Sequence, residues 1–161
     1  MDNAIVIRPG TVDDAPIVGA LVMDLLPFLT LDPQGRGAES FVANIDAAAQ
    51  ARYLAAPSFR YRLAWRGDTL AGFVAMRDNG HLFHLFVERA LHGQGLGRRL
   101  WELARDEALA LGNPGVFTVN ASDHAVAMYA RLGFVPAGPR EAQRGIAWRP
   151  MRLDSDSNAR A

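Results

Sequence analysis

The sequence predicts a single α/β (α+β) domain whose elements follow the order β-α-α-β-β-β-α-β-α-β. Two observations predict it: short β-branched and aromatic runs are bounded by turn residues, and segments with an apolar period of about 3.6 residues lie between them. No repeat or internal linker divides the 161 residues, and a chain of this length buries roughly 70% of its unfolded surface. We expect the domain over residues 1–153 and a polar tail over residues 154–161.

The N-terminal part is predicted to hold one strand and two helices. Residues 4–8 have the alternation of a short strand. Asp13 or Asp14 is expected to cap the first helix, because a carboxylate accepts hydrogen bonds from the free N–H groups of a first turn. Residues 32–37 contain Pro and two Gly, which predicts a loop, and the Ala-rich residues 39–54 predict a second helix.

The middle of the chain is predicted to be β-structure, followed by alternating helices and strands. Residues 59–66, 69–77 and 81–87 predict three antiparallel strands, and Asn79-Gly80 is expected to form the second turn because both residues tolerate a positive φ. After Gly97 the apolar period lengthens to that of a helix, which ends at Gly112. The remaining expected elements are a strand over residues 115–120, a helix over 123–132 and a strand over 145–153.

The composition excludes several kinds of chemistry. Cysteine is absent, so disulfides, thiolate nucleophiles and Cys-based metal sites are excluded. All 17 basic residues are Arg, which excludes Schiff-base chemistry and Lys-dependent phosphate loops, and they balance 17 acidic residues. Four scattered His predict no metal site. No signal peptide or membrane-spanning stretch is evident, so we expect a soluble, cytoplasmic protein.

The most informative segment joins a strand to a helix through a glycine loop. It reads His92-Gly93-Gln94-Gly95-Leu96-Gly97-Arg98. Glycines allow a phosphate to approach the backbone, and the following helix offers unpaired N–H groups at the positive end of its dipole. The spacing is not that of a dinucleotide-binding loop, and the Lys of a Walker loop is absent. The sequence therefore predicts an anion site, with a merely flexible connection as the alternative.

This loop resembles motif A of the GCN5-related N-acetyltransferase (GNAT) superfamily, which reads Gln/Arg-x-x-Gly-x-Gly/Ala. The first position is His92 here, in place of Gln or Arg. The resemblance implies that acetyl-CoA binds as the acetyl donor, without a metal. Its pyrophosphate would lie on the loop, and its pantetheine arm would bond to the backbone of the preceding strand. The implied cofactor residues are Leu85, Phe86, Val87, His92, Gly93, Gln94, Gly95, Leu96, Gly97 and Arg98.

Residues 118–134 resemble motif B of the same superfamily, whose signature Tyr-x-x-Leu-Gly-Phe is here Tyr129-Ala130-Arg131-Leu132-Gly133-Phe134. Together the two motifs imply a central, mostly antiparallel mixed sheet flanked by helices. They also imply direct transfer of an acetyl group from acetyl-CoA to the amine of a small molecule or peptide, through a ternary complex. Nucleic acid and membrane are not expected as partners, and a homodimer is left open.

Tyr129 is the candidate general acid. The resemblance implies this role, and a phenol with a pKa near 10 remains a donor at neutral pH. Its position within an apolar helical pattern offers a core-packing role as the alternative. Near the cofactor arm the superfamily places an Asn seven residues before this tyrosine. That position is Ser122 here, and Asn120 lies two residues upstream, so both are expected at the site, with a turn or helix-cap role as the alternative for either residue.

His81 is the candidate general base, because some superfamily members place a Glu six residues before the position of Val87, and that register falls on His81. An imidazole has a suitable pKa for this role. His84, Glu88 and water remain alternatives, and a cross-strand contact is the structural alternative for either histidine. Strand alternation places residues 81, 83, 85 and 87 on one face and residues 82, 84 and 86 on the other. The Glu that other members place twelve residues before the tyrosine is Phe117 here.

Two other functions are compatible with the sequence. One is a catalytically silent acetyl-CoA-binding sensor or interaction module, and the other is a nucleotide-binding protein that uses the same loop. The acceptor is not defined by the motifs. Asp24 and Asp32 are acidic residues that could attract a cationic amine, or they are ordinary surface residues.

Overall fold

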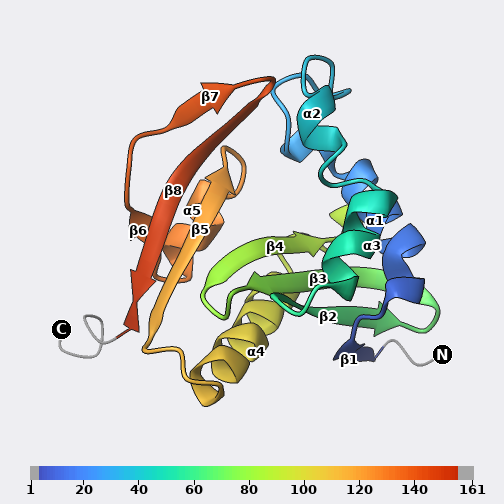
Figure 1. Ribbon diagram of the computed structural model, residues 1–161. Helices are drawn as coiled ribbons and strands as arrows, with labels where there is room; N and C mark the ends of the chain where they lie inside the picture. The colour runs from blue at the N-terminus through green and yellow to red at the C-terminus, as the bar shows by residue number, and fades with distance from the viewer. Residues whose placement is uncertain (1–3, 156–161) are drawn as a thin grey trace.

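The computed structural model describes residues 4–155, which form one mixed sheet with helices on both faces (Figure 1). The strands are β1 (Ile5–Pro9), β2 (Phe59–Arg66), β3 (Thr69–Arg77), β4 (His81–Val87), β5 (Val116–Ser122), β6 (Val135–Pro136), β7 (Glu141–Gln143) and β8 (Ile146–Asp154). Their order is β1-β2-β3-β4-β5-β8-β6, with β7 paired to β8, and the β4–β5 pair alone is parallel among these described strands. The predicted fold class is confirmed. From residue 156 onward, the predicted polar tail lies outside the described residues.

The helices divide the interior into two hydrophobic cores. They are α1 (Ala15–Asp24), α2 (Glu39–Val42), α3 (Ala47–Ala55), α4 (Leu96–Ala110) and α5 (Val126–Arg131), with short 3₁₀ turns η2 (Leu26–Phe28) and η3 (Arg89–Leu91). α1 and α3 cover one face of β2–β4, and α4 covers the other (Figure 1). The α4 core includes Trp101, Phe117 and Phe134, whose rings pack edge to face at 5.1 and 5.2 Å. The α1–α3 core includes Val18, Leu63 and Phe73.

β4 and β5 part soon after they meet. Their parallel pairing has two residue pairs, His81 with Thr118 and Leu82 with Val119, and Figure 1 shows the strands diverging beyond them. Over Phe83–Val87, every second residue therefore points its backbone N–H and C=O groups away from β3, where no neighbouring strand pairs with them. We call this segment the free edge of β4. Because backbone polar groups require partners, a free edge inside a sheet is a place where a ligand can bind.

A β-bulge in β4 corrects the predicted alternation of its side chains. Ala75 pairs with His84 and Met76 pairs with Leu82, so Phe83 has no opposite residue in β3. β4 therefore has one residue more than β3 at this point. Beyond the extra residue, the alternation of side chains between the two faces of the sheet is shifted by one position. Leu82 therefore joins Leu85 in the α4 core, whereas Phe83 and His84 both lie on the α1–α3 side.

The N-terminal helices also differ from the prediction. Residues 39–54 form two helices, α2 and α3, because the chain turns between them and Asp46 restarts the helix by accepting the N–H of Ala49 at 2.9 Å. Asp14 precedes α1, but its carboxylate accepts the N–H of Thr11 at 2.8 Å and makes no cap bond to α1. The predicted capping of the first helix by an Asp side chain is therefore wrong.

Turns and short strands account for the other differences. The β3–β4 turn uses Asp78 and Asn79 as its positive-φ residues, with φ of 51° and 56°, in place of Asn79 and Gly80. β6 and β7 were not predicted. The β7–β8 turn reaches the loop after α1, where Leu31 donates its N–H to the Gly145 carbonyl at 2.9 Å. We call this contact the roof, because it joins the two walls of the cavity described below.

Candidate active site

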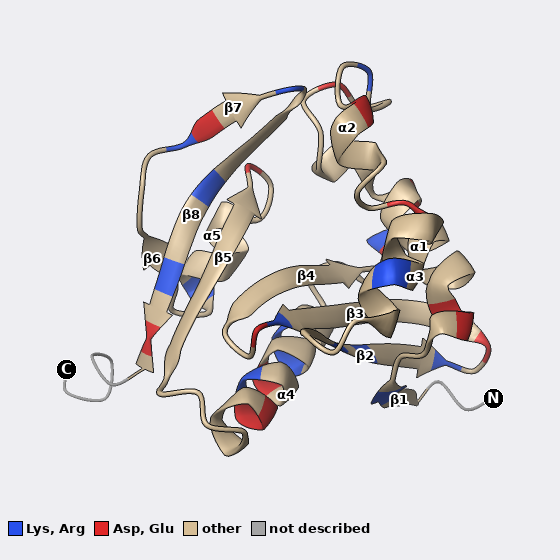
Figure 2. Cartoon of the chain, viewed as in Figure 1, with Lys and Arg blue, Asp and Glu red and all other residues tan. Residues whose placement is uncertain are grey.

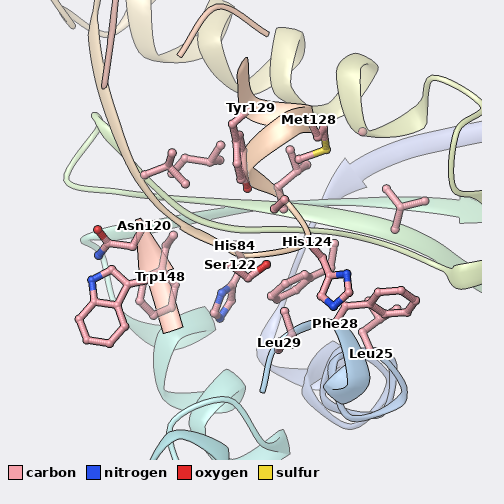
Figure 3. Close-up of a pocket in the computed structure, with 18 of the residues that line it drawn as sticks. Leu25, Phe28, Leu29, His84, Asn120, Ser122, His124, Met128, Tyr129 and Trp148 are labelled. Atoms are coloured by element: carbon pink, nitrogen blue, oxygen red, sulfur yellow. The ribbon is translucent and has the colours of Figure 1, made fainter. Parts of the chain in front are cut away.

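A cavity of about 1070 Å³ lies where β4 and β5 part. It is lined by the free edge of β4, the outward face of β5, the starts of α4 and α5, and residues from the α1–α3 layer (Figure 3). All residues that the sequence placed in the site line it, except Gln94. The Gln94 side chain instead donates to the Ala90 carbonyl at 3.1 Å.

The glycine loop gives α4 an open N-terminus. Gly95 precedes the helix with a φ of 89°, a left-handed conformation that favours glycine, and it has no side chain to cap the helix. The first helical bond runs from the Arg99 N–H to the Gly95 carbonyl at 3.1 Å. The preceding N–H groups of the first turn, from Leu96 to Arg98, therefore have no acceptor within the helix. Together with the helix dipole, they form a site suited to a phosphate.

Two arginines add positive charge to this end of the cavity. Arg98 and Arg131 both line it, and the Arg98 guanidinium donates to the Arg131 carbonyl at 3.3 Å. Arg98 also pairs with Glu102, one helical turn away, at 3.8 Å. The sequence reasoning missed Arg131, although it lies inside the Tyr-x-x-Leu-Gly-Phe signature. Its position follows from the packing of α5 beside the start of α4.

Part of the free edge of β4 is already occupied by a side chain. The His92 Nε2 atom donates to the Val87 carbonyl at 2.7 Å, and the His92 ring packs edge to face on Phe28 at 5.3 Å. Val87 is thus less available to a ligand than its two predecessors, Leu85 and Phe86. His92 contacts the strand from the loop, so its role differs from that of a direct phosphate ligand.

Tyr129 combines a core position with access to the cavity. It lies on α5, is 5% exposed and packs its ring against Phe134 at 5.6 Å, as the core-packing alternative requires. Its hydroxyl points into the cavity (Figure 3). No hydrogen-bond partner for this hydroxyl exists among residues 4–155. Burial raises the pKa of the Tyr129 phenol well above its usual value, so the hydroxyl remains a proton donor.

His81 lines the same cavity beside a residue that the sequence reasoning missed. Its Nδ1 atom lies 2.8 Å from the Thr118 hydroxyl across the β4–β5 pair. When Nδ1 carries the proton and donates to Thr118, the lone pair of Nε2 is free to accept one. Burial, with a smaller contribution from Arg77, lowers the pKa of His81, which leaves the imidazole neutral at pH 7. Thr118 was identifiable only from the strand register.

His84 is held in a buried hydrogen-bond network. The Tyr61 hydroxyl donates to Gln50 Oε1 at 2.6 Å, and Gln50 Nε2 lies 3.0 Å from the Ile45 carbonyl and 3.3 Å from His84 Nε2. The Gln50 amide donates to His84 Nε2, so this nitrogen has no free lone pair. Burial lowers the pKa of His84 to about 3. These features favour His81 over His84 as a base.

The acidic candidates lie away from the cavity. Glu88 follows β4, pairs with Arg66 at 3.7 Å and does not line the cavity. Asp32 accepts the N–H groups of Gln34 and Arg36, both at 3.0 Å, and these backbone bonds lower its pKa. Asp24 does not line the cavity either.

The described residues, 4–155, contain neither a metal-ligand cluster nor a membrane-spanning helix. No group of three or more His, Asp or Glu in this range is arranged to hold a metal ion. Within the same range, no helix combines the length and the apolar character needed to cross a membrane.

The profile described as "Acetyltransferase (GNAT) domain" matches residues 29–155. The chain therefore belongs to the GNAT acetyltransferase family, as its two motifs predicted.

Curated relatives and solved structures agree with this assignment. The chain is 32% identical to the "IAA acetyltransferase" of Azospirillum brasilense over 93 residues, or 53% of this chain and 61% of that protein. It is 31% identical over 87 residues to "Acetyltransferase Atu2258" of Agrobacterium fabrum, or 51% of this chain and 64% of the relative. The match thus spans less than two thirds of either relative.

Two solved structures are similar over nearly their whole length. A GCN5-related N-acetyltransferase from Rhodopseudomonas palustris aligns with a TM-score of 0.77 and 24% identity, over 96% of this chain and 98% of that one. The PaiA N-acetyltransferase of Thermoplasma acidophilum, solved in complex with coenzyme A, aligns with a TM-score of 0.73 and 15% identity, over 94% and 99%. At these identities the structures support the fold.

Proposed function

We propose that the protein transfers an acetyl group from acetyl-CoA directly to an amine, in a ternary complex. The observation that carries the proposal is the Tyr129 hydroxyl, which points into the cavity between the free edge of β4 and β5 (Figure 3). It is a protonated donor without a protein partner among the described residues, and it lies in the cavity that the phosphate site of α4 also lines.

The residues of the cavity fit this donor. The N–H groups at the start of α4, with Arg98 and Arg131, suit the pyrophosphate. The free edge of β4 at Leu85 and Phe86 suits the amides of the pantetheine arm, with Asn120 and Ser122 on the opposite wall. When bound, acetyl-CoA supplies a thioester whose acyl carbon accepts the amine.

Two proton transfers are assigned to the chain. His81 Nε2 accepts a proton from the amine, and Thr118 positions the ring by accepting the hydrogen of Nδ1. Tyr129 Oη donates a proton to the departing sulfur. No covalent acyl-enzyme is required, which suits a chain without cysteine.

The test is to replace Tyr129 with Phe, which keeps the ring in the core and removes the donor. A general acid contributes about 10²–10⁴-fold, so kcat should fall by that order while acetyl-CoA affinity is retained. The readout is release of free CoA thiol with a panel of amines. Tyr61→Phe is the matched control, because Tyr61 is equally buried but does not line the cavity. It is expected to lower stability and to retain kcat.

The results of these measurements distinguish an enzyme from a catalytically silent binding module. Activity of Tyr129→Phe within about twofold of the parent would contradict the general-acid role. Tight acetyl-CoA binding without CoA release for any amine would favour the silent binding module, and a stronger thermal shift with ATP than with acetyl-CoA would favour nucleotide binding.

A further inference from the structure

The part of the cavity that faces the α1–α3 layer is walled by aromatic side chains. Phe41, Tyr53 and Phe83 from this side and Trp148 from β8 line the cavity, and we call these four residues the aromatic wall. We infer that the acceptor is a monoamine carried on an aromatic ring system. The inference rests on the proposed acetyl transfer and names the substrate class for that same site.

The Tyr53 and Phe83 part of the aromatic wall is built from packed rings. The Tyr53 and Phe83 rings pack edge to face at 4.9 Å, and Phe59 lies 4.9 Å behind each of them. The Tyr53 hydroxyl donates its hydrogen to the Asn44 carbonyl at 2.8 Å, which fixes the orientation of the ring. Packed rings of this kind favour another ring by offset or edge-to-face contact.

Other sides of the cavity are also lined by aromatic rings. Figure 3 shows Trp148 and Phe28 on opposite sides, with His84 between them. His84 is a neutral ring, because its Nε2 accepts from Gln50. A flat apolar acceptor would therefore meet aromatic rings on several sides of the cavity.

The charges around the cavity disfavour a polyamine. None of the residues that line it, within the described part of the chain, is Asp or Glu, and β4 and β5 are uncharged along their length (Figure 2). The charged groups on the lining are Arg77, Arg98 and Arg131. Arg77 stands over the Phe83 ring at 5.7 Å, and its nearest acid, Asp78, already pairs with it at 3.6 Å. Arg98 and Arg131 lie at the α4 end of the cavity, so an additional ammonium group near the aromatic wall would meet Arg77 and would find no carboxylate on the lining to pair with.

A comparison of acceptors tests the inference in the 161-residue chain. Tryptamine, 2-phenylethylamine and spermidine are supplied with saturating acetyl-CoA, and release of CoA thiol is measured. We expect kcat/KM for both aromatic amines to exceed that for spermidine by at least about 100-fold. A kcat/KM for spermidine equal to or above theirs would overturn the inference and leave the proposed transfer intact.

A binding measurement separates this inference from the proposed function. Tryptamine is titrated calorimetrically into protein saturated with CoA, where no transfer is possible. Binding of tryptamine but not spermidine, without turnover of any amine, would support the aromatic site and contradict the transfer. Absence of tryptamine binding together with absence of turnover would overturn the inference.

Matched variants locate the contact. Trp148→Leu is expected to raise the KM for tryptamine about tenfold or more with unchanged CoA affinity, and Trp148→Phe is expected to retain most of the parent value. Trp65→Leu is the control, because Trp65 lies under Arg8 at 4.6 Å and does not line the cavity. An equal KM for tryptamine in Trp148→Leu and the parent would overturn the assignment of the aromatic wall.

Discussion

Acidification is expected to destabilise the fold through His84. Burial lowers the pKa of this imidazole from 6.5 to about 3, whereas the unfolded chain exposes it to water and protonates it near pH 6.5. Between these values the unfolded state binds more protons, so the contribution of His84 to stability is complete above pH 6.5 and is lost as the pH falls. At pH 5 the difference of about 1.5 pH units corresponds to about 2 kcal/mol.

Replacement of His84 by Leu isolates this loss. In the variant one Gln50 amide N–H keeps the Ile45 carbonyl as its acceptor at 3.0 Å and the other loses His84, a cost that is the same at both pH values. The free energy of unfolding is measured in urea at pH 7.5 and pH 5.0, and the loss between them should be about 2 kcal/mol smaller in His84→Leu than in the parent. His124→Leu, at an exposed position, is expected to keep the loss of the parent. An equal loss in His84→Leu and the parent would refute the reasoning.

Three further predictions concern the site. Because burial lowers the pKa of His81, kcat/KM should rise with pH along a limb centred below pH 6.5. His81→Ala should abolish that limb, and an unchanged pH profile in the variant would contradict the role of His81 as a base. In Gly95→Val the added Cβ meets no protein atom within 4 Å, but a φ of 89° adds about 1–2 kcal/mol of strain. The isopropyl group blocks the phosphate site, so acetyl-CoA should bind at least about tenfold more weakly by calorimetry. Unchanged affinity would place the pyrophosphate elsewhere. In Gly145→Ala the new Cβ would lie 2.6 Å from the Gly37 carbonyl carbon, so the roof must open and the melting temperature should fall, as thermal unfolding would show.

The sequence predicted the secondary-structure elements that are determined by residues close together in the chain. The three central strands have the predicted bounds, because each aromatic or β-branched run ends at a turn. The glycine loop was identifiable because glycine and a helix start are both local features. The two motifs also led to the correct family.

The missed features depend on residues far apart in the chain. The bulge at Phe83 is defined by its pairing with β3, and the short strands β6 and β7 exist through their pairing with β8. Likewise, the contact of His81 with Thr118 requires the parallel register of β4 and β5. The break within residues 39–54 is a local feature instead, because Asp46 accepts the N–H of Ala49 and starts α3, a cap that the Ala-rich composition of the run conceals.

The free edge of β4 makes the solubility of this protein depend on the closure of its cavity. Exposed strand edges are commonly protected by charged residues, proline or a very short length, and unprotected ones template the pairing of other chains. β4 has seven residues and carries no Asp, Glu, Lys, Arg or Pro. Instead, the cavity walls and the roof at Gly145 cover the free edge of β4 and keep other strands away from it. A variant that opens the roof would expose an apolar template for intermolecular β-pairing, and aggregation would then precede complete unfolding.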